Sequence, residues 1–388
     1  MPNAPAPPDV APPDVPRRLL DWYDRHRRVL PWRAPPGAVA DPYRVWVSEV
    51  MLQQTTAAAV ANAFEGFLAR FPSVEALAAA PIDQVLHAWQ GFGYYARARN
   101  LHRAAGVVAA RGGRFPDTEE GLRALPGVGA YIAAAVAAIA FGRKATVVDA
   151  NVERVVARLF AIRTPLPTAK PAVRSATATL TPDDRPGDFA QAMMDLGATI
   201  CTPRQPRCII CPLQPACLAS AEGIAAVLPA KLPKPERPLR HGVAFWLRAP
   251  DGSVLLRRRP AEGLLGGMME VPTSPFRAEP WQPADALAVA PLAADWQLLP
   301  GIVTHGFTHF GLEIRLFAAR ADDPAPELGS WSAVARLGEH ALPTLMKKVV
   351  RHALAAEDGV RQAPAPHRAR AAATRRASAA PAPAGQRR

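Results

Sequence analysis

All four cysteines of this 388-residue chain lie within seventeen residues, which constrains the local fold more than any other feature. They are Cys201, Cys208, Cys211 and Cys217, in the spacing C-x6-C-x2-C-x5-C. No cysteine remains to cross-link the rest of the chain, so we expect a metal centre rather than a disulfide framework. Thiolates select zinc or iron–sulfur, and the uneven spacing favours a single [4Fe-4S] cluster over a zinc ribbon with paired knuckles. Zinc and unligated thiols are the alternatives.

The hydrophobic pattern divides the chain into two folded domains. From residue 16 to residue 229, apolar residues recur at three- and four-residue spacing, which predicts an all-α domain. Residues 241–358 instead alternate like strands, with a hairpin signal at Asp251-Gly252, and close with a helical pattern. We therefore expect a multidomain protein in which an all-α domain is followed by an α+β domain.

A linker separates these domains, and a low-complexity tail lies at each end of the chain. Residues 230–240 carry three prolines among basic residues, which predicts an extended linker. Residues 1–15 and 359–388 are rich in proline, alanine or arginine. Because they cannot bury enough apolar surface to order, they are predicted to be disordered tails.

The charge of the chain favours a polyanionic partner. The net charge is +13, which suits nucleic acid before a membrane surface. Seven of those charges are arginines in residues 359–388, so the rest of the chain carries +6. The sequence has neither an uncharged apolar run of about eighteen residues nor the pattern of a signal peptide. We therefore expect a cytoplasmic monomer that does not enter a membrane.

The segment 125–151, LPGVGAYIAAAVAAIAFGRKATVVDAN, pairs a glycine-rich turn with a distant acid. Gly127 and Gly129 permit a tight turn whose backbone N–H groups, at the start of a helix, suit a phosphate. Asp149 follows about twenty residues later, at the far end of the predicted helix. The arrangement favours chemistry on a nucleotide. The plainer interpretation is a turn, a core helix and a loop aspartate.

Three motifs together resemble the helix-hairpin-helix DNA glycosylases: the cysteine spacing, LPGVG with its distal VDAN, and WVSEVMLQQT at residues 46–55. Within that superfamily the chain resembles the adenine DNA glycosylase (MutY) family, from residue 17 to about residue 350. The resemblance implies a six-helix part at about residues 38–146 and an iron–sulfur part at residues 16–37 and 147–223, followed by a Nudix-like domain. It also implies release of adenine mispaired with 8-oxoguanine or G in double-stranded DNA, within base excision repair.

The resemblance assigns catalysis to two carboxylates. Glu49 lies in the apolar run VWVSEVML, where a raised pKa lets it protonate adenine N7 and later activate water. Asp149 is expected to stay ionised and to stabilise the oxocarbenium-like sugar. Paired acids with divergent pKa values serve glycoside hydrolysis in this way. Without the resemblance, Glu49 is interpreted as a surface glutamate on a helix.

Tyr131 occupies the position where endonuclease III-type enzymes carry a lysine that attacks the sugar. A phenol cannot form a Schiff base, so the resemblance implies a monofunctional enzyme that leaves an abasic site. Lys144, at the other end of the same predicted helix, is not expected to substitute. Tyr131 and Asn151 are expected to hydrogen-bond around the two catalytic acids.

The resemblance also assigns the DNA contacts. Extrusion of a base breaks its stacking and pairing, so a side chain must fill the gap. Gln54, between Gln53 and Thr55, matches that wedge, and Tyr94 matches the residue inserted beside the damaged partner base. The pocket around the flipped adenine is expected to contain Arg28, Trp32, Arg33, Leu52 and Gln191.

The second domain matches the recognition part of the family. Phe307, Thr308 and His309, in THGFTHFGLEI, match the loop that reads the altered edge of 8-oxoguanine, although a structural strand end is the plainer interpretation. Nudix hydrolases bind metal through a glutamate-rich helix. Here Glu270 is followed by no acidic array, so we predict neither metal binding nor pyrophosphatase activity in this domain.

Two positions depart from the family pattern. Ala150 stands where glycine is usual, and its methyl group is expected to crowd the sugar or to require a backbone adjustment; Ala190 stands where asparagine is common. Arg97 and Arg99, just after Tyr94, are expected to contact phosphates. The rival functions are an endonuclease III-type glycosylase and AP lyase, separable by borohydride trapping, and a non-catalytic iron–sulfur DNA-binding protein, separable by an adenine-release assay.

Overall fold

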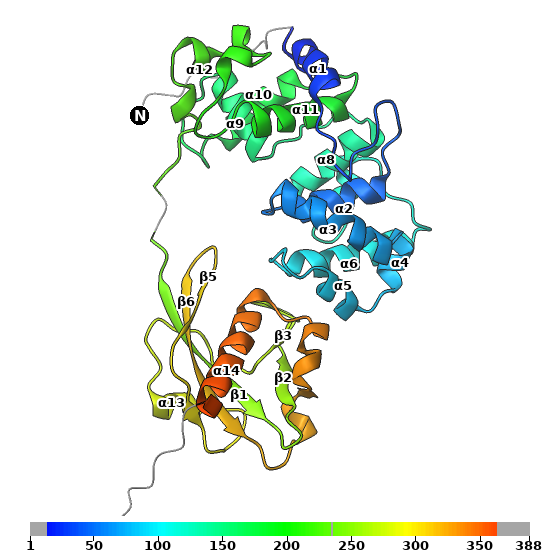
Figure 1. Cartoon of the computed structure of the whole chain (residues 1–388). Helices are drawn as coiled ribbons and strands as arrows, with labels where there is room; N and C mark the ends of the chain where they lie inside the picture. The colour runs from blue at the N-terminus through cyan, green and yellow to red at the C-terminus, as the bar shows by residue number, and fades with distance from the viewer. Residues whose placement is uncertain (1–13, 234–235, 363–388) are drawn as a thin grey trace, which may run out of the picture.

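The computed structural model describes residues 14–233 and 236–362, which form an all-helical domain and a mixed α/β domain (Figure 1). The predicted tails fall mostly outside these residues, as do residues 234–235 of the predicted linker. The described chain begins with α1 (Val15–His26) and ends with α14 (Thr344–Gln362), so the predicted domain end at residue 358 lies inside a helix. Within the described ranges, none of the helices combines the length and hydropathy needed to cross a bilayer.

The first part of the helical domain is built around a tightly packed aromatic core. Trp46, Phe64 and Trp89 are fully buried there, and the alanine-rich α8 passes between them and the second part. Residues 38–146 form seven helical segments, one of which, α7, has only five residues, whereas the resemblance implied six. They are α2 (Pro42–Leu52), α3 (Ala57–Arg70), α4 (Val74–Ala79), α5 (Ile82–Ala88), α6 (Ala96–Ala109), α7 (Glu119–Arg123) and α8 (Ala130–Phe141).

The second part of the helical domain draws its helices from both sides of the first. Leu19, Trp22 and Tyr23 of α1 pack in one core with residues more than a hundred positions later, among them Val152 and Leu196. The later helices are α9 (Ala150–Leu159), α10 (Lys170–Leu180), α11 (Pro186–Thr199) and α12 (Leu218–Ala221). The all-α prediction for this domain is confirmed.

The hydrophobic pattern runs without interruption from residue 43 to residue 71, yet the structure breaks it between α2 and α3. The Thr56 side chain accepts a hydrogen bond from the Ala59 N–H and caps α3. Gln54 adopts a φ of 57°, in the left-handed region that a non-glycine residue rarely occupies. Residues 53–56 therefore form a short, partly exposed loop instead of a helical turn.

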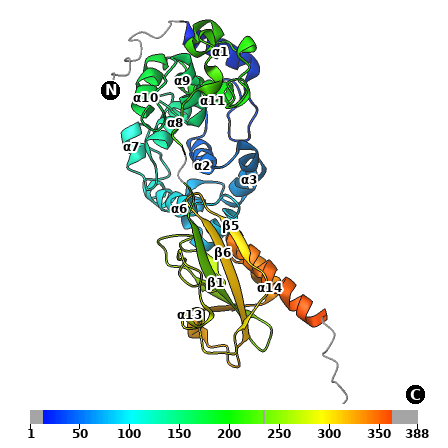
Figure 2. The same ribbon diagram turned by 90° about the vertical axis from the view of Figure 1, so that its left-hand side faces the viewer.

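The second domain is built on a seven-stranded mixed sheet with α14 on one face and α13 (Pro283–Leu287) on the other (Figure 2). Successive residues of β1 face opposite layers, with Trp246 toward α14 and Phe245 toward α13, as strand geometry requires. The α+β prediction and the hairpin around residues 251–252 are confirmed. The strands are β1 (Leu239–Arg248), β2 (Val254–Arg258), β3 (Met269–Glu270), β4 (Gln297–Leu298), β5 (Val303–Gly306), β6 (Gly311–Arg320) and β7 (Ser330–Ser332).

The two domains meet on the surface of α5 and α6. Met268 of the second domain is fully buried and belongs to the core of the helical domain. Arg258 forms a bidentate ion pair with Asp83, at 2.7 and 2.8 Å. The Arg99 guanidinium donates to the carbonyl oxygen of Gly266. Arg99, which was expected to contact phosphate, thus takes part in the contact between the domains.

Candidate active site

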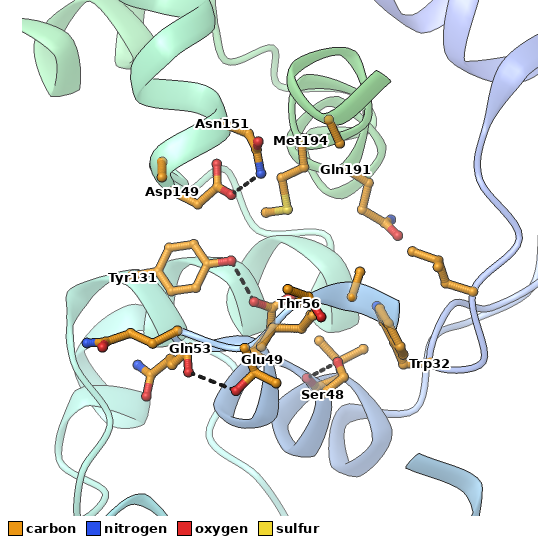
Figure 3. A pocket seen from close by; sticks show the side chains of 18 of the residues that line it. Trp32, Ser48, Glu49, Gln53, Thr56, Tyr131, Asp149, Asn151, Gln191 and Met194 are labelled. Carbon is orange, nitrogen blue, oxygen red and sulfur yellow. Dashed lines mark hydrogen bonds between the residues drawn. The ribbon is translucent and has the colours of Figure 1, made fainter. Parts of the chain in front are cut away.

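A cavity of about 730 Å³ opens between the two parts of the helical domain. Its walls come from α2 and α8 on one side and from α9 and α11 on the other (Figure 3). Most of the side chains expected at the catalytic site line this single cavity. They are Arg28, Trp32, Arg33, Glu49, Leu52, Gln53, Gln54, Thr55, Tyr94, Tyr131, Asp149, Asn151 and Gln191.

Glu49 is an almost fully buried acid near the end of α2. Only 3% of its surface is exposed, and the Tyr131 hydroxyl donates a hydrogen bond of 2.6 Å to its Oε2 (Figure 3). Burial raises the pKa of Glu49 to about 7, the hydrogen bond from Tyr131 opposes that shift, and the charge of Asp149 adds to it. A carboxyl group with such a pKa can give up or take a proton at neutral pH.

Asp149 lies across the cavity, where it caps the N-terminus of α9. Its carboxylate accepts hydrogen bonds from the Val152 N–H and from Asn151 Nδ2, each 2.7 Å long. Burial raises the pKa of Asp149, and these two donors oppose the shift by stabilising the ionised form. The cavity thus holds one acid with a single hydroxyl donor and a second acid with two N–H donors at a helix N-terminus.

A buried ion-pair network closes one wall of the cavity. Arg33 makes a bidentate contact with Asp195, at 2.6 and 2.8 Å, and Arg28 Nε donates to the same carboxylate at 2.5 Å. Burial alone raises the pKa of Asp195, but the hydrogen bonds and charge of Arg33 hold the net value below the usual one. Arg28 and Arg33 therefore line the pocket with their cationic groups already bound to a carboxylate.

Sequence reasoning missed Asp195, and also Met194, which points into the cavity (Figure 3). The largely apolar helix α11 carries two acids, and Asp195, unlike the partly exposed Asp188 of the first turn, is fully buried. A charged residue at a position that the helical pattern assigns to the core was the available signal. Its partners, more than 160 positions away in the sequence, could not be read from that pattern.

The two loops expected to enter DNA lie at the rim of the cavity. Gln54 and Tyr94 both have left-handed backbone conformations, with φ of 57° and 45°. Tyr94 is 43% exposed. Arg97 was expected to contact phosphate; its partly buried guanidinium donates to backbone carbonyls at the end of α2 and in both loops.

The glycine pair of the LPGVG turn lies outside this cavity. Gly127 has a φ of +75°, and an added Cβ would overlap the side chain of Asn100, so glycine is required there. Gly129 has an ordinary φ of −86°, and its Cβ position has no atom within 4 Å. The expectation that the turn needs glycine at position 129 for its backbone conformation is therefore wrong. The open space beside it leaves room for close approach by a ligand.

The predicted recognition residues Phe307, Thr308 and His309 form the loop between β5 and β6 and do not line the cavity. Thr308 and His309 are exposed at its tip. The Thr308 hydroxyl hydrogen-bonds the Tyr94 hydroxyl, so the loop touches the cavity rim across the domain boundary. Glu270, deeper in the same domain, is 1% exposed and pairs with Arg257 and Arg259.

The two departures from the family pattern occupy different environments. Ala150 lines the cavity and is the first residue of α9. Its backbone is helical, a conformation that alanine adopts as readily as glycine, so the expected backbone adjustment is not needed. Its methyl group is exposed beside Asp149. Ala190 is 4% exposed and lies in the aromatic core, away from solvent.

The four cysteines converge after the end of α11. All four thiols are free and line one small cavity of about 30 Å³. The fully buried Arg158 donates a hydrogen bond of 3.2 Å to Cys201 Sγ. Among the described residues, no three His, Cys, Asp or Glu side chains are placed to hold a single metal ion. Thiolates are ligands for both zinc and iron–sulfur centres, so these four cysteines are the residues that would hold either one.

Comparison with known proteins adds independent evidence. Residues 47–179 match the HhH-GPD superfamily base excision DNA repair protein model, and residues 243–352 match the NUDIX domain model. Human adenine DNA glycosylase is 34% identical over 402 residues, covering 86% of this chain and 72% of the human protein. The mouse adenine DNA glycosylase is 35% identical over 394 residues, covering 86% and 76%. The adenine DNA glycosylase of Mycolicibacterium smegmatis is 44% identical over 199 residues, covering 51% and 67%. The chain therefore belongs to the adenine DNA glycosylase family, within the HhH-GPD superfamily of base excision DNA repair proteins.

Proposed function

We propose that the protein is a monofunctional glycosylase that hydrolyses the N-glycosidic bond of adenine mispaired with 8-oxoguanine or G in double-stranded DNA. One observation carries the proposal. The buried Glu49, with a pKa of about 7, faces the hydrogen-bonded Asp149 across a cavity in a chain whose relatives are adenine DNA glycosylases.

The two acids divide the reaction between them. Protonated Glu49 donates its proton to N7 of the extruded adenine, so the base leaves as a neutral molecule with the electron pair of the C1′–N9 bond. The resulting sugar cation is stabilised by the Asp149 carboxylate, which Val152 and Asn151 hold in place. Glu49, now ionised, accepts a proton from the water that attacks C1′ and is restored to its starting form.

The geometry around Tyr131 supports a monofunctional reaction. Its hydroxyl is already bound to Glu49, and a phenol cannot form a Schiff base with the sugar. Lys144 does not line the cavity and lies 3.0 Å from Asp183, on the far end of α8. No amine that could attack C1′ is therefore present among the side chains of the cavity wall.

The loop of residues 307–309 supports recognition of 8-oxoguanine. Its exposed tip touches Tyr94 at the cavity rim, so both residues would lie next to a base opposite the extruded adenine. Thr308 and His309 offer donors and acceptors that can distinguish an oxidised purine edge from that of guanine.

The four cysteines would hold a [4Fe-4S] cluster. Such a cluster, when bound, supplies cross-links through its iron–sulfur bonds to a segment that has little regular structure. Cys201 follows α11, whose Asp195 closes the cavity wall, so the cysteine loop anchors the end of a helix that shapes the pocket. We expect stoichiometric iron and acid-labile sulfide in protein purified without oxygen.

A single-turnover assay on duplexes containing A:8-oxoguanine or A:G tests the function. Wild-type protein is expected to release free adenine and to leave an alkali-labile site, with no strand cleavage before alkali. Glu49→Gln is expected to lose adenine release, and Asp149→Asn to lose at least ~100-fold in rate, the scale of one electrostatic stabiliser. Strand cleavage without alkali, or borohydride trapping of wild type, would contradict the monofunctional proposal.

A further inference from the structure

Arg97 holds two separate backbone segments, residues 50–55 and 92–93, with one side chain. Its Nη1 donates to the carbonyls of Val50 and Met51, at 2.8 and 3.1 Å, and to that of Gln53. Its Nη2 donates to the carbonyl of Phe92 at 2.8 Å. Weaker contacts reach the Gly93 carbonyl at 3.3 Å and the Thr55 hydroxyl at 3.4 Å.

These contacts join the C-terminal end of α2, the helix that carries Glu49, to two loops at the cavity rim. We call these the rim loops: residues 53–56 and residues 92–94. The last carbonyls of a helix have no intrahelical donor, and Arg97 supplies one while placing a cation at the negative end of the dipole. Each rim loop also contains a residue in the left-handed region, Gln54 or Tyr94. Such conformations persist only where the surroundings hold them. The guanidinium carbon lies 5.8 Å from the centre of the Tyr94 ring.

We propose that Arg97 is a positioning residue that fixes both rim loops relative to Glu49. When the loops enter DNA, the extruded adenine is then held at a fixed position relative to the Glu49 carboxyl group. The inference rests on the proposed function. Loss of Arg97 would leave several buried carbonyls without donors, and both loops would move relative to the catalytic acid. A misplacement of about 1 Å is enough to cost ~100-fold in rate.

The chemistry of the guanidinium makes the proposal specific to arginine. A planar fork with five N–H donors can span carbonyls on both segments, whereas a lysine ammonium is a compact point charge. If Arg97 acted by binding phosphate, its positive charge would be what matters. Lysine carries the same charge and would preserve that binding. Arg97→Lys therefore separates positioning from charge, and Arg97→Met removes both.

The test compares these two variants with wild type and with Arg103→Met. Arg103 is exposed on the same helix and bonds to Asn100, so its loss removes an equal charge without touching either loop. Three quantities are measured on an A:8-oxoguanine duplex: the single-turnover rate at saturating protein, the dissociation constant with its salt dependence, and the fluorescence rise of 2-aminopurine placed at the adenine position. Amide hydrogen exchange reports the two loops directly.

Positioning predicts that both Arg97 variants lose at least ~10-fold in rate while the dissociation constant changes less than ~3-fold and its salt slope is unchanged. Both loops would exchange faster together, and α9 would keep its protection. Full activity of Arg97→Lys, weaker binding with a smaller salt slope, or failure of both variants to fold would overturn the proposal. Inactive wild-type protein would instead overturn the proposed function.

Discussion

At the scale of single residues, the environment of Glu49 decides what the site can do. The same glutamate on an exposed helix would be ionised at neutral pH and useless as an acid. Burial within α2 raises its pKa to about 7, and Tyr131 then limits that rise by donating to the carboxylate. The acid is consequently kept close to half-protonated at neutral pH, which suits a group that must donate a proton and later accept one.

The pH dependence of adenine release should follow Glu49. Because the protonated form is the reactive one, we expect the single-turnover rate to fall as pH rises through about 7. Tyr131→Phe removes a donor that stabilises the ionised form, so the pKa of Glu49 should rise and the falling limb should move to higher pH. Rate profiles of wild type and of Tyr131→Phe provide the measurement. A limb displaced to lower pH would rule out this role for Tyr131.

The sequence predicted which residues meet at the cavity but not how they are held. The motifs WVSEVMLQQT and VDAN identified Glu49 and Asp149 because each motif is local. Asp195 and Arg97 act through contacts with distant segments, Asp195 with a loop more than 160 positions earlier. No local pattern encodes such a contact. Arg97 therefore resembled a phosphate ligand in the sequence.

At the scale of elements, the β5–β6 loop is the part that we propose to carry specificity. Its residues 307–309 leave the sheet at the end of a paired ladder, so the rigid strands β5 and β6 fix where the tip lies. The tip meets Tyr94 in the other domain. The alternating pattern predicted the strands themselves, whereas the break at residues 53–56 was not predicted, since an apolar pattern continues through it.

Removal of one polar side chain from the loop should alter the preference between A:8-oxoguanine and A:G rather than the catalytic step. We expect His309→Ala to weaken the preference for A:8-oxoguanine over A:G by roughly 10-fold, the scale of one hydrogen bond to a base edge, while A:G cleavage survives. The measurement is the ratio of single-turnover rates on the two duplexes. Thr304→Ala, exposed on β5 below the tip, is the matched control. An unchanged ratio for His309→Ala would remove this residue from recognition.

At the scale of the whole molecule, an apolar contact holds the two domains together. Met268 is fully buried within the core of the helical domain. The Arg258–Asp83 ion pair beside it is about half exposed on both sides, and such pairs contribute roughly 0–1 kcal/mol. Docking should therefore depend on the buried methionine far more than on the ion pair.

Met268→Lys should release the second domain, because a buried ammonium without a partner is costly. We expect the radius of gyration from small-angle scattering to rise and the A:8-oxoguanine to A:G rate ratio to fall toward one, with A:G cleavage retained. Asp83→Ala should change neither quantity. If Met268→Lys keeps both the compact shape and the ratio, the apolar contact does not hold the recognition loop in place.

The assembly of one helical core from both sides of the chain also affects synthesis. Leu19, Trp22 and Tyr23 of α1 must wait for their partners in α9 and α11. Arg28 and Asp195 are separated by 167 residues, so at about 5–20 residues per second the wait is roughly 8–33 s. During that interval the apolar side of α1 on the nascent chain has no partner helix to pack against. Chaperones that recognise nascent apolar segments should therefore bind α1 before the pocket of the enzyme can close.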